Sequence, residues 1–230
     1  MTAPPVLQNV KVAVDNCIFT VVDGRLQVLL IKMRKKPFGG MWALPGGLID
    51  EGESLRDAAA RILKEQTGVV GLYLEQLYTF DGRTRDPEGR VVSVAYYSLV
   101  PPVGLALGTT PKYEAVRFWG CNDRPRELAY DHEAILGYAQ ARLQAKVQYT
   151  NVMWSLLPPR FTLRELQTAY QGVLDRGLDK RNFRKKILSM DLLVETDEVE
   201  QGVRHRAARL YRFDRRKYDR LTKQGFELSI

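Results

Sequence analysis

One motif in the first third of the chain constrains the fold more than any other feature. It places two glycines, glutamates and an arginine at fixed spacing. Apolar residues recur at helical spacing through residues 54–66, which predicts a helix. Gly68 follows, and glycine favours the left-handed backbone that ends helices. Ile62, Glu65 and Gln66 would share one helical face, because they are three and four residues apart. The residues at fixed spacing are Gly47, Glu53, Arg61, Leu63, Glu65, Gly68 and Val69.

This spacing resembles the Nudix box, whose helix presents three glutamates on one face. In that family the three carboxylates hold Mg²⁺, which bridges a diphosphate and activates water. Here only Glu65 stands at one of the three positions, and Ile62 and Gln66 occupy the others. The loss of two negative charges weakens the binding of a divalent cation. We therefore expect nucleotide binding with lost or feeble hydrolysis, no catalytic residue, no required cofactor, and at most weak Mg²⁺ binding at Glu65.

The alternative interpretation of Glu53, Arg61 and Glu65 is an ordinary cluster of surface charges. The complete register, with a Pro-Gly-Gly run before it, favours the functional interpretation. Gly46 and Gly47 can let backbone N–H groups approach a phosphate, and Arg61 can organise the carboxylates of the loop.

Strand-like segments surround the box. They are rich in β-branched and apolar residues, and Asp23-Gly24 is a hairpin signal between two of them. A polar turn at residues 81–90 separates two others. The expected strands are 10–14, 17–22, 28–31, 70–80, 91–100 and 115–119, and a helix at 131–148 closes this part of the chain.

The net charge of +8 is distributed unevenly along the 230 residues. Residues 1–148 contain 18 Lys/Arg and 16 Asp/Glu, a net of +2, whereas residues 149–230 contain 17 and 11, a net of +6. The run Leu157-Pro158-Pro159-Arg160 suits a linker, since proline disfavours helix at its own position and before it. We therefore expect an N-terminal domain at 1–148 and a basic domain at 149–230, and such asymmetry points toward nucleic acid.

Several classes of protein are disfavoured by what the sequence lacks. No apolar run approaches the roughly 18 residues of a membrane helix, and residues 1–5 do not begin a secretory signal. Cys17 and Cys121 provide neither a disulfide framework nor metal spacing, and His132 and His205 are too far apart in the sequence to form a ligand pair. We expect a cytoplasmic, nucleoid-associated protein with no membrane partner.

The basic region predicts a winged helix. Thr162 and Glu165 form a capping box at the start of a helix that ends near Gly177. A second helix begins near Asp179, with Phe183, Ile187 and Leu188 as its expected core anchors. Strand-like residues 192–195 and 209–213 complete a wing.

In this arrangement the second helix enters the major groove of DNA, where Arg and Asn contact guanine and adenine. The alternative is a solvated basic helix in a structural subdomain. The expected DNA contacts are Thr162, Lys180, Arg181, Asn182, Arg184, Lys185, Arg204, His205 and Arg206.

The combination resembles NrtR, the Nudix-related transcriptional regulators of NAD metabolism. The resemblance rests on residues 42–47, 129–132, 161–167, 179–186 and 208–213. It implies an α/β protein with a Nudix-fold mixed sheet sandwiched by helices, followed by a C-terminal winged helix-turn-helix domain. It also implies a homodimeric repressor that senses ADP-ribose or a related NAD metabolite and binds double-stranded operator DNA upstream of NAD biosynthesis or salvage genes.

The loop entering the box supplies further candidates for ligand binding. An aromatic ring there could stack on adenine and an arginine could neutralise a diphosphate, although core packing is an equal alternative for Phe38 and Trp42. The turn from Arg83 to Arg90 is a candidate cover for the pocket. The expected ligand residues are Arg34, Phe38, Trp42, Gly46, Gly47, Glu53, Arg61 and Glu65.

Two other functions stay open at this point. One is an ADP-ribose pyrophosphatase with residual activity, in which Glu51, Glu53 and Glu65 hold a metal ion weakly. The other is a Nudix-type regulator of sugar use that binds a pentose or its phosphate, which would need a small pocket rich in hydrogen bonds.

Overall fold

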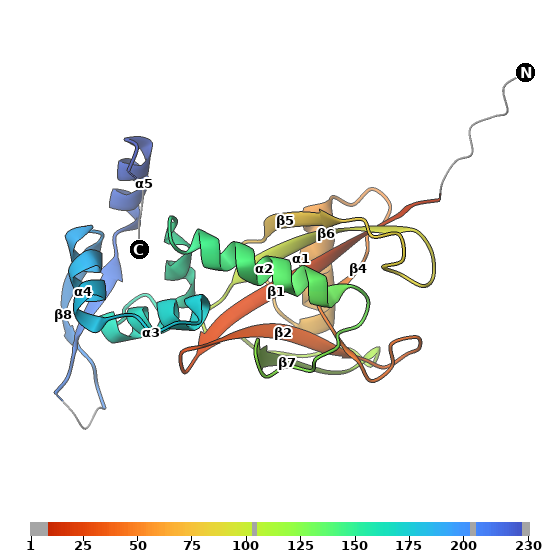
Figure 1. The fold of residues 1–230 in the computed structure, drawn as a ribbon, viewed down its shortest axis with the longest axis horizontal. Coiled ribbons are helices and arrows are strands. Elements are labelled where there is room, and N and C mark those ends of the chain that lie inside the picture. The colour runs from red at the N-terminus through yellow and green to blue at the C-terminus, as the bar shows by residue number, and fades with distance from the viewer. Residues whose placement is uncertain (1–8, 103–104, 203–205, 227–230) are drawn as a thin grey trace, which may run out of the picture.

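A mixed sheet forms the N-terminal part of the computed structural model, which describes residues 9–102, 105–202 and 206–226 (Figure 1). Its central strands run in the order β3-β2-β1-β6-β5, while β4 pairs with β1 and β7 with β2. The β1–β6 pair is parallel and β1–β2 is antiparallel. The strands of this sheet are β1 (Lys11–Val22), β2 (Arg25–Met33), β3 (Trp42–Ala43), β4 (Gly46–Leu48), β5 (Glu75–Phe80), β6 (Val91–Leu99) and β7 (Tyr113–Gly120).

Strand β1 is continuous, although the sequence predicted two strands, 10–14 and 17–22. Asp15 and Asn16 separate the two apolar runs, yet both are buried, at 3% and 0% exposure. The Asn16 amide donates to the carbonyls of Pro45 and Ala59, and Asp15 has charged and hydroxyl partners from distant segments. Buried polar groups persist when such partners satisfy them. Tertiary contacts therefore override the local polar signal.

Helices cover both faces of the sheet, which confirms the predicted sandwich. Helix α1 (Leu55–Thr67) packs on one face with Val14 and Ile18 of β1, and α2 (His132–Lys146) packs on the other with Cys17 and Phe19. The alternation follows from the two-residue period of a strand. The two faces of β1 thus serve two separate apolar clusters.

The C-terminal part has the predicted helix, turn, helix and hairpin, so the winged helix is confirmed. The Thr162–Glu165 capping box is present, and α3 ends at Leu174, earlier than the expected end near Gly177. Helix α4 is anchored by Phe183 and Ile187, as expected. The elements are the 3₁₀-helix η1 (Asn151–Leu156), α3 (Leu163–Leu174), α4 (Lys180–Ser189), β8 (Leu193–Val199), β9 (Arg209–Phe213) and α5 (Arg215–Lys223).

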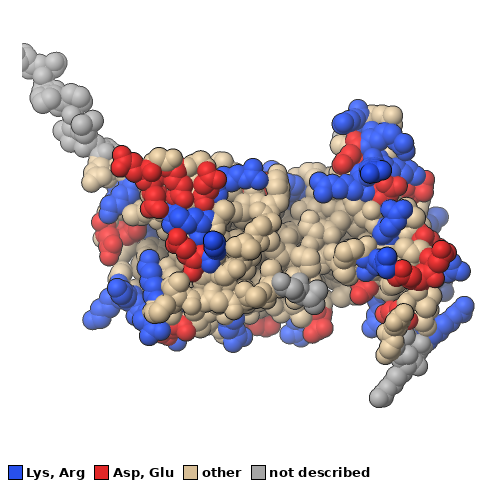
Figure 2. Space-filling view, turned by 180° about the vertical axis from the view of Figure 1, so that it is seen from behind, with Lys and Arg blue, Asp and Glu red and all other residues tan. Residues whose placement is uncertain are grey.

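Two features of this part differ from the sequence prediction. Leu188 is 46% exposed and does not anchor α4, because it lies to the side of the buried Phe183–Ile187 line. Helix α5 was not predicted, and it projects from the end of the molecule with Lys and Arg gathered on it (Figure 2). No helix in the described ranges is long and apolar enough to cross a lipid bilayer.

The two parts of the molecule are packed together rather than merely linked. Helix α3 lies against the tip of the β1–β2 hairpin, where a Cβ on Gly172 would come within 2.7 Å of the Gly24 carbonyl oxygen. One apolar cluster runs from Phe19 in the sheet through α3 to Phe183 and Ile187 in α4. A boundary at 148/149 stays a prediction, but the core itself is continuous across that point.

Candidate ligand pocket and nucleic-acid interface

A buried carboxylate, Asp15 on β1, is the centre of the polar network in the N-terminal part. Arg85 Nη2 lies 3.0 Å and Ser93 Oγ 2.6 Å from its Oδ2, while His132 Nε2 lies 3.2 Å from its Oδ1. Burial alone would raise the pKa of Asp15, but His132, Ser93 and Arg85 together lower the pKa to about 2. The carboxylate is therefore charged at neutral pH despite its burial.

The network fixes three distant segments against each other. Arg85, from the turn before β6, also binds Asp131 through two hydrogen bonds of 3.0 and 2.8 Å. His132 Nδ1 accepts the Leu44 N–H at 2.9 Å, so the ring proton of the neutral imidazole lies on Nε2, facing Asp15. The turn, the start of α2 and the end of β3 are thus held by one set of charge-assisted bonds.

A cavity of about 310 Å³ opens above this network. The rings of Tyr113 and Tyr130 line it, and the exposed Lys11 and Lys112 lie at its rim. The predicted cover is present in part, since Arg85, Asp86 and Glu88 of the turn line the same cavity. The lining thus combines two aromatic residues with cations and carboxylates; the aromatic residues suit a planar ligand, and the two lysines suit an anionic group on it.

The charges of the box lie elsewhere, around Arg61 on α1. Its guanidinium contacts Glu53 at 2.8 Å, Asp50 at 3.3 Å and Glu65 at 3.5 Å. Hydrogen bonds from Arg61 lower the pKa of Glu53 to about 2. None of the residues that line the cavity belongs to α1. Arg61, Glu53 and Glu65 therefore stabilise the loop before α1, and direct contact of these three with a ligand stays a prediction.

The two departures from the box pattern have become part of the core. Gln66 is 5% exposed, and its amide forms a closed pair with Gly46: Oε1 accepts the Gly46 N–H at 3.0 Å, and Nε2 donates to the Gly46 carbonyl at 2.7 Å. Ile62 is 2% exposed, and its Cδ1 would lie 3.5 Å from a Cβ added to Gly47. Both polar atoms of the Gln66 side chain are therefore engaged by the Gly46 backbone rather than directed toward a metal ion.

The expectation that the Gly46 N–H binds a phosphate is wrong for the same reason. Gly46 lies at the floor of the cavity, where a Cβ would fall 2.0 Å from Asp15 Oδ1, so glycine is needed for space. Gly47 also lines the cavity and stays a ligand candidate.

A three-carboxylate Mg²⁺ site does not fit these residues. Ile62 offers no ligand, Gln66 is engaged, and the one remaining glutamate of that face, Glu65, is paired with Arg61. Within the described ranges, no group of three or more His, Cys, Asp or Glu side chains is arranged to hold a metal ion. Weak binding of Mg²⁺ at Glu65 stays a prediction.

The aromatic residues predicted on the entry loop do not line the cavity. Ala43 of β3 does, so Trp42 points to the opposite side and packs edge-on to Trp119, with centroids 5.2 Å apart. Phe38 packs against Tyr130 at 4.2 Å, and Tyr130 rather than Phe38 lines the cavity. These contacts favour core packing, the alternative noted for both, and contact of either ring with a ligand stays a prediction.

Arg34 is exposed and donates to the Tyr113 carbonyl at 3.2 Å, so it lies beside a cavity residue and stays a ligand candidate. The sequence did not predict four residues of the cavity, Lys11, Asp15, Lys112 and Tyr113. No local pattern marks them, because Lys11 and Asp15 on β1 meet the neighbours Lys112 and Tyr113 only in the folded chain. Arg85 and Tyr130 had weak signals, in the predicted cover and in the run 129–132.

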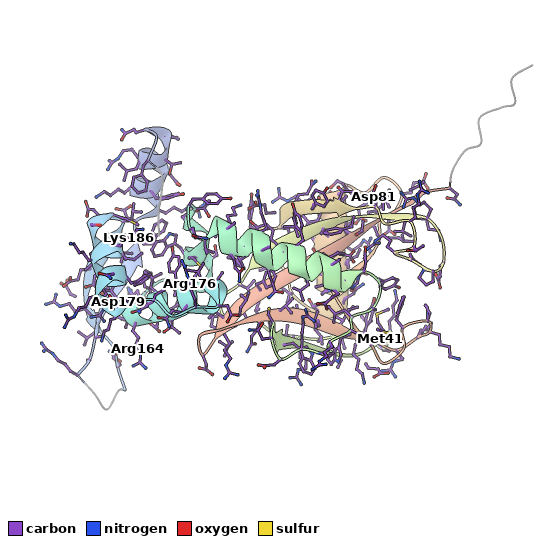
Figure 3. All side chains as sticks on the ribbon, in the orientation of Figure 1. Met41, Asp81, Arg164, Arg176, Asp179 and Lys186 are labelled. Carbon is purple, nitrogen blue, oxygen red and sulfur yellow. The ribbon has the colours of Figure 1, made fainter. Side chains whose placement is uncertain are left out.

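Helix α4 presents its basic residues outward at the end of the molecule. Lys180, Arg181, Asn182 and Lys185 are exposed, while the helix runs from its cap at Asp179 past Lys186 (Figure 3). The Asp179 carboxylate accepts the Asn182 N–H at 2.8 Å. The exposed side chains are free to reach base edges and phosphates, as a recognition helix requires.

Some of the expected DNA contacts need correction. Thr162 is 1% exposed, and its hydroxyl caps α3 by accepting the Glu165 N–H, so it does not reach DNA. Arg184 is half-buried, with its Nε unpartnered among the described atoms, and is a weaker candidate than its neighbours. Arg206 is exposed, whereas Arg204 and His205 lie outside the described residues.

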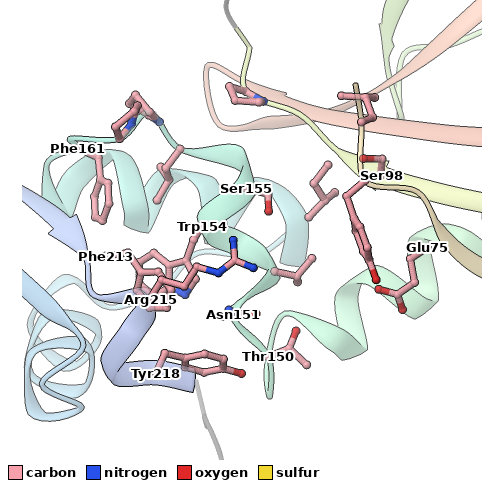
Figure 4. Close-up of a pocket in the computed structure, with 18 of the residues that line it drawn as sticks. Glu75, Ser98, Thr150, Asn151, Trp154, Ser155, Phe161, Phe213, Arg215 and Tyr218 are labelled. Carbon is pink, nitrogen blue, oxygen red and sulfur yellow. The ribbon is translucent and has the colours of Figure 1, made fainter. Parts of the chain in front are cut away.

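A second cleft, of about 1270 Å³, lies between the sheet edge and the C-terminal part (Figure 4). Trp154 and Phe213 form a stacked pair on its wall, with centroids 4.3 Å apart, and Glu75 and Ser98 come from the sheet side. It contains no residue of the box. The cleft therefore lies where the sheet edge faces the C-terminal part.

Both parts of the chain match families of known proteins. Residues 11–136 match the NUDIX domain family, and residues 153–213 match the NrtR DNA-binding winged helix domain. The chain is 38% identical over 210 residues to the ADPR responsive transcriptional repressor NtrR of Acinetobacter baylyi, covering 90% of this chain and 83% of that protein.

Two solved structures extend the likeness. Shewanella oneidensis NrtR in complex with a 27mer DNA superposes with a TM-score of 0.74 at 32% identity, covering 94% of this chain and 97% of that one. The NUDIX domain of the same protein in complex with ADP ribose superposes with a TM-score of 0.55 at 36% identity, covering 62% and 94%.

Proposed function

The chain belongs to the NrtR family, and on that premise we propose that it is a transcriptional repressor that binds operator DNA and responds to ADP-ribose or a related NAD metabolite. In this proposal the winged helix binds the operator, and the cavity above Asp15 binds the effector. The regulated genes would be those of NAD biosynthesis or salvage, and the protein would act on DNA in the cytoplasm.

The observation that carries this proposal is the continuous core between a polar, aromatic-walled cavity and an exposed basic helix. In the proposed complex, Tyr113, Tyr130 and the two rim lysines, which line the cavity, would contact a planar anionic ligand. Helix α4 exposes Arg181 and Asn182, the residue types that read guanine and adenine. A chain that only hydrolysed nucleotides would need neither that helix nor its rigid attachment.

The β1–β2 hairpin supplies a physical connection between the two sites. At one end Asp15 of β1 and Ile31 of β2 line the cavity; at the other end Gly24 touches Gly172 of α3. A ligand that shifts the hairpin would change the angle at which α3, and with it α4, meets the sheet. Regulation follows if the ligand binds the two arrangements with different affinity.

We propose that the protein acts as a homodimer. Helix-turn-helix dimers bind half-sites whose spacing matches the distance between their recognition helices. A small change in the angle between the two parts of each protomer would then be enough to lose the match.

The experiment is a titration of fluorescent duplexes from the promoters of NAD genes with the full chain, repeated with ADP-ribose, with and without Mg²⁺. The release of AMP is measured in the same samples. Specific binding that ADP-ribose reverses, without AMP, is the expected result. Specific binding that responds to a pentose phosphate but not to ADP-ribose would instead identify a regulator of sugar use.

A second candidate function, residual ADP-ribose pyrophosphatase activity, has one observation in its favour. Glu53 and Glu65 both contact the Arg61 guanidinium, at 2.8 and 3.5 Å, so two carboxylates remain near each other at the box. Steady AMP release that depends on Mg²⁺, in the absence of specific DNA binding, would favour this function over the repressor.

A further inference from the structure

Helix α5 is a second basic helix that the proposed recognition by α4 does not use. The winged-helix match ends at residue 213, and α5 spans Arg215–Lys223. Together α4 and α5 contain ten Lys/Arg and one Asp, whereas the rest of residues 149–230 contains seven Lys/Arg and ten Asp/Glu. The basic excess of the C-terminal part therefore lies entirely on these two helices.

One face of α5 attaches it to the protein. Tyr218 packs on Phe213 with centroids 5.7 Å apart, and Phe213 in turn stacks on Trp154. The Asp214 carboxylate caps the helix by accepting the Lys217 N–H at 2.9 Å. The orientation of α5 is therefore fixed by an aromatic contact on the side that carries Tyr218.

The opposite face carries three cations, Arg216, Arg220 and Lys223, which we term the α5 stripe. Their spacing of four and three residues places them in one line along the helix, about 10 Å long at 1.5 Å per residue. In the described structure none of the three forms a hydrogen bond or an ion pair, whereas Arg215 contacts Asp219 at 3.9 Å and Lys217 binds Asp191. Like charges at this spacing repel each other, so the stripe is destabilising unless an anion lies against it.

The stripe is held close to the end of α4. Asp191, which binds Lys217, follows α4 directly, and the Asp214 N–H donates to the Leu192 carbonyl at 2.9 Å. In the ribbon view α5 continues past the Lys186 end of α4, on the side of the molecule away from the sheet (Figures 1 and 3). A duplex seated on α4 therefore has its flanking backbone within reach of α5.

We propose that the α5 stripe binds the phosphate backbone of the DNA that flanks the segment read by α4. This inference rests on the proposed DNA binding and adds a second, sequence-independent contact surface to it. Three unpaired cations in a line suit a row of phosphates, which carry one charge each at short, regular intervals. The contact would add affinity and position α4, without reading bases.

The test compares the full chain with the triple variant Arg216→Gln, Arg220→Gln, Lys223→Gln, which keeps the helical propensity of α5. Affinity for the operator and for a scrambled duplex of equal length is measured by fluorescence anisotropy between 50 and 200 mM salt. Each lost phosphate contact reduces the slope of log K against log salt by about 0.9. We expect the slope to fall by about 2.7 for each bound protomer on both duplexes. Across this salt range, the variant should therefore lose about 40-fold less affinity than the wild type for each protomer bound.

The matched control is Lys64→Gln, Arg126→Gln, Arg142→Gln, which removes three exposed cations from the N-terminal part. Circular dichroism verifies that both variants are folded. The proposal is overturned if the α5 variant changes the salt slope no more than this control does. It is also overturned if the slope is unchanged and the variant instead alters the molar mass in solution, because the stripe would then contact a second copy of the chain.

The design separates this inference from the proposed function. A wild-type chain that recognises no operator but shows the slope difference on the scrambled duplex would refute the repressor and support the stripe. Specific, ADP-ribose-sensitive operator binding with an unchanged slope would support the repressor and refute the stripe.

Discussion

The charged groups of the cavity and those of α4 and α5 are arranged in opposite ways. At the floor of the cavity Asp15 and Arg85 are buried, and the Arg85 guanidinium pairs with Asp15 at 3.0 Å and with the half-buried Asp131 at 2.8 Å. On α4 and the α5 stripe all the cations except the half-buried Arg184 are exposed, and most lack a partner within the described structure. The buried network fixes one geometry, and the loss of one member destabilises the whole network. The exposed cations contribute to binding additively, their contribution falls with added salt, and the fold tolerates the loss of any one of them.

The largest effect should come from breaking the buried network at Arg85. In Arg85→Met the carboxylate of Asp15 stays buried without its guanidinium, which should cost about 3–5 kcal/mol of unfolding free energy. Urea denaturation measures this. Arg83→Met, in the exposed part of the same turn, is the control and should behave like the wild type. Equal stability of both variants would show that the network does not hold the fold.

The same network predicts a loss of stability in acid. Because the pKa of Asp15 falls from an ordinary value of 3.8 to about 2 on folding, its contribution is complete above pH 4 and disappears as the pH falls toward 2. The contribution is about 2 kcal/mol. The unfolding free energy of the wild type minus that of Asp15→Asn, measured between pH 5 and 2.5, should shrink by about two thirds of this amount, because the rest is lost only below pH 2.5. A constant difference would contradict the assigned pKa.

The contact between the two parts gives a smaller effect, with a matched pair of helical glycines. In Gly172→Ala the new methyl group would meet the Gly24 carbonyl at 2.7 Å, and such overpacking costs about 1–3 kcal/mol. Gly137→Ala on α2 meets nothing within 4 Å and should stabilise by about 0.5–1 kcal/mol. If the hairpin connects the two sites, Gly172→Ala should also blunt the ADP-ribose response of DNA binding. An unaltered response in a destabilised Gly172→Ala protein would remove the hairpin from the mechanism.

Single changes on α4 should be the mildest, because they leave the fold intact. Arg181→Ala should reduce operator affinity by about 1–3 kcal/mol and relax base preference. The free energy of unfolding should stay within about 0.5 kcal/mol of the wild type. Competition between operator and single-base variants measures the preference. Unchanged discrimination would mean that Arg181 does not read a base.

Local signals were sufficient for most elements of the fold. The Thr162–Glu165 capping box, the helix before Gly68 and the hairpin at Asp23-Gly24 each appear where the sequence placed them. Helix α5 was not predicted because its short, mostly basic run has few apolar residues. Its place is set by tertiary contacts, the Tyr218 ring on Phe213 and the pairing of Lys217 with Asp191. The interruption predicted in β1 was wrong because Asp15 and Asn16 find partners far away in the chain.

The functional site was less predictable than the fold. The box pattern directed attention to Glu53, Arg61 and Glu65, which pair with each other rather than line the cavity. The cavity instead takes Lys11, Arg85, Tyr113 and Tyr130 from four segments. Trp42 illustrates the limit: its position beside the box was clear, but which side of β3 it faces depends on strand pairing.

By itself, the sequence determined the family, the two architectures and the basic character of α4, because these depend on spacing, capping and charge along one stretch of chain. The tertiary structure decided what became of the altered box. It paired Gln66 with Gly46 and placed Ile62 in the core, and it assembled the cavity around Asp15 from residues as far apart in the chain as Lys11 and His132. Such partnerships depend on how strands pair and helices pack, and no local pattern encodes them.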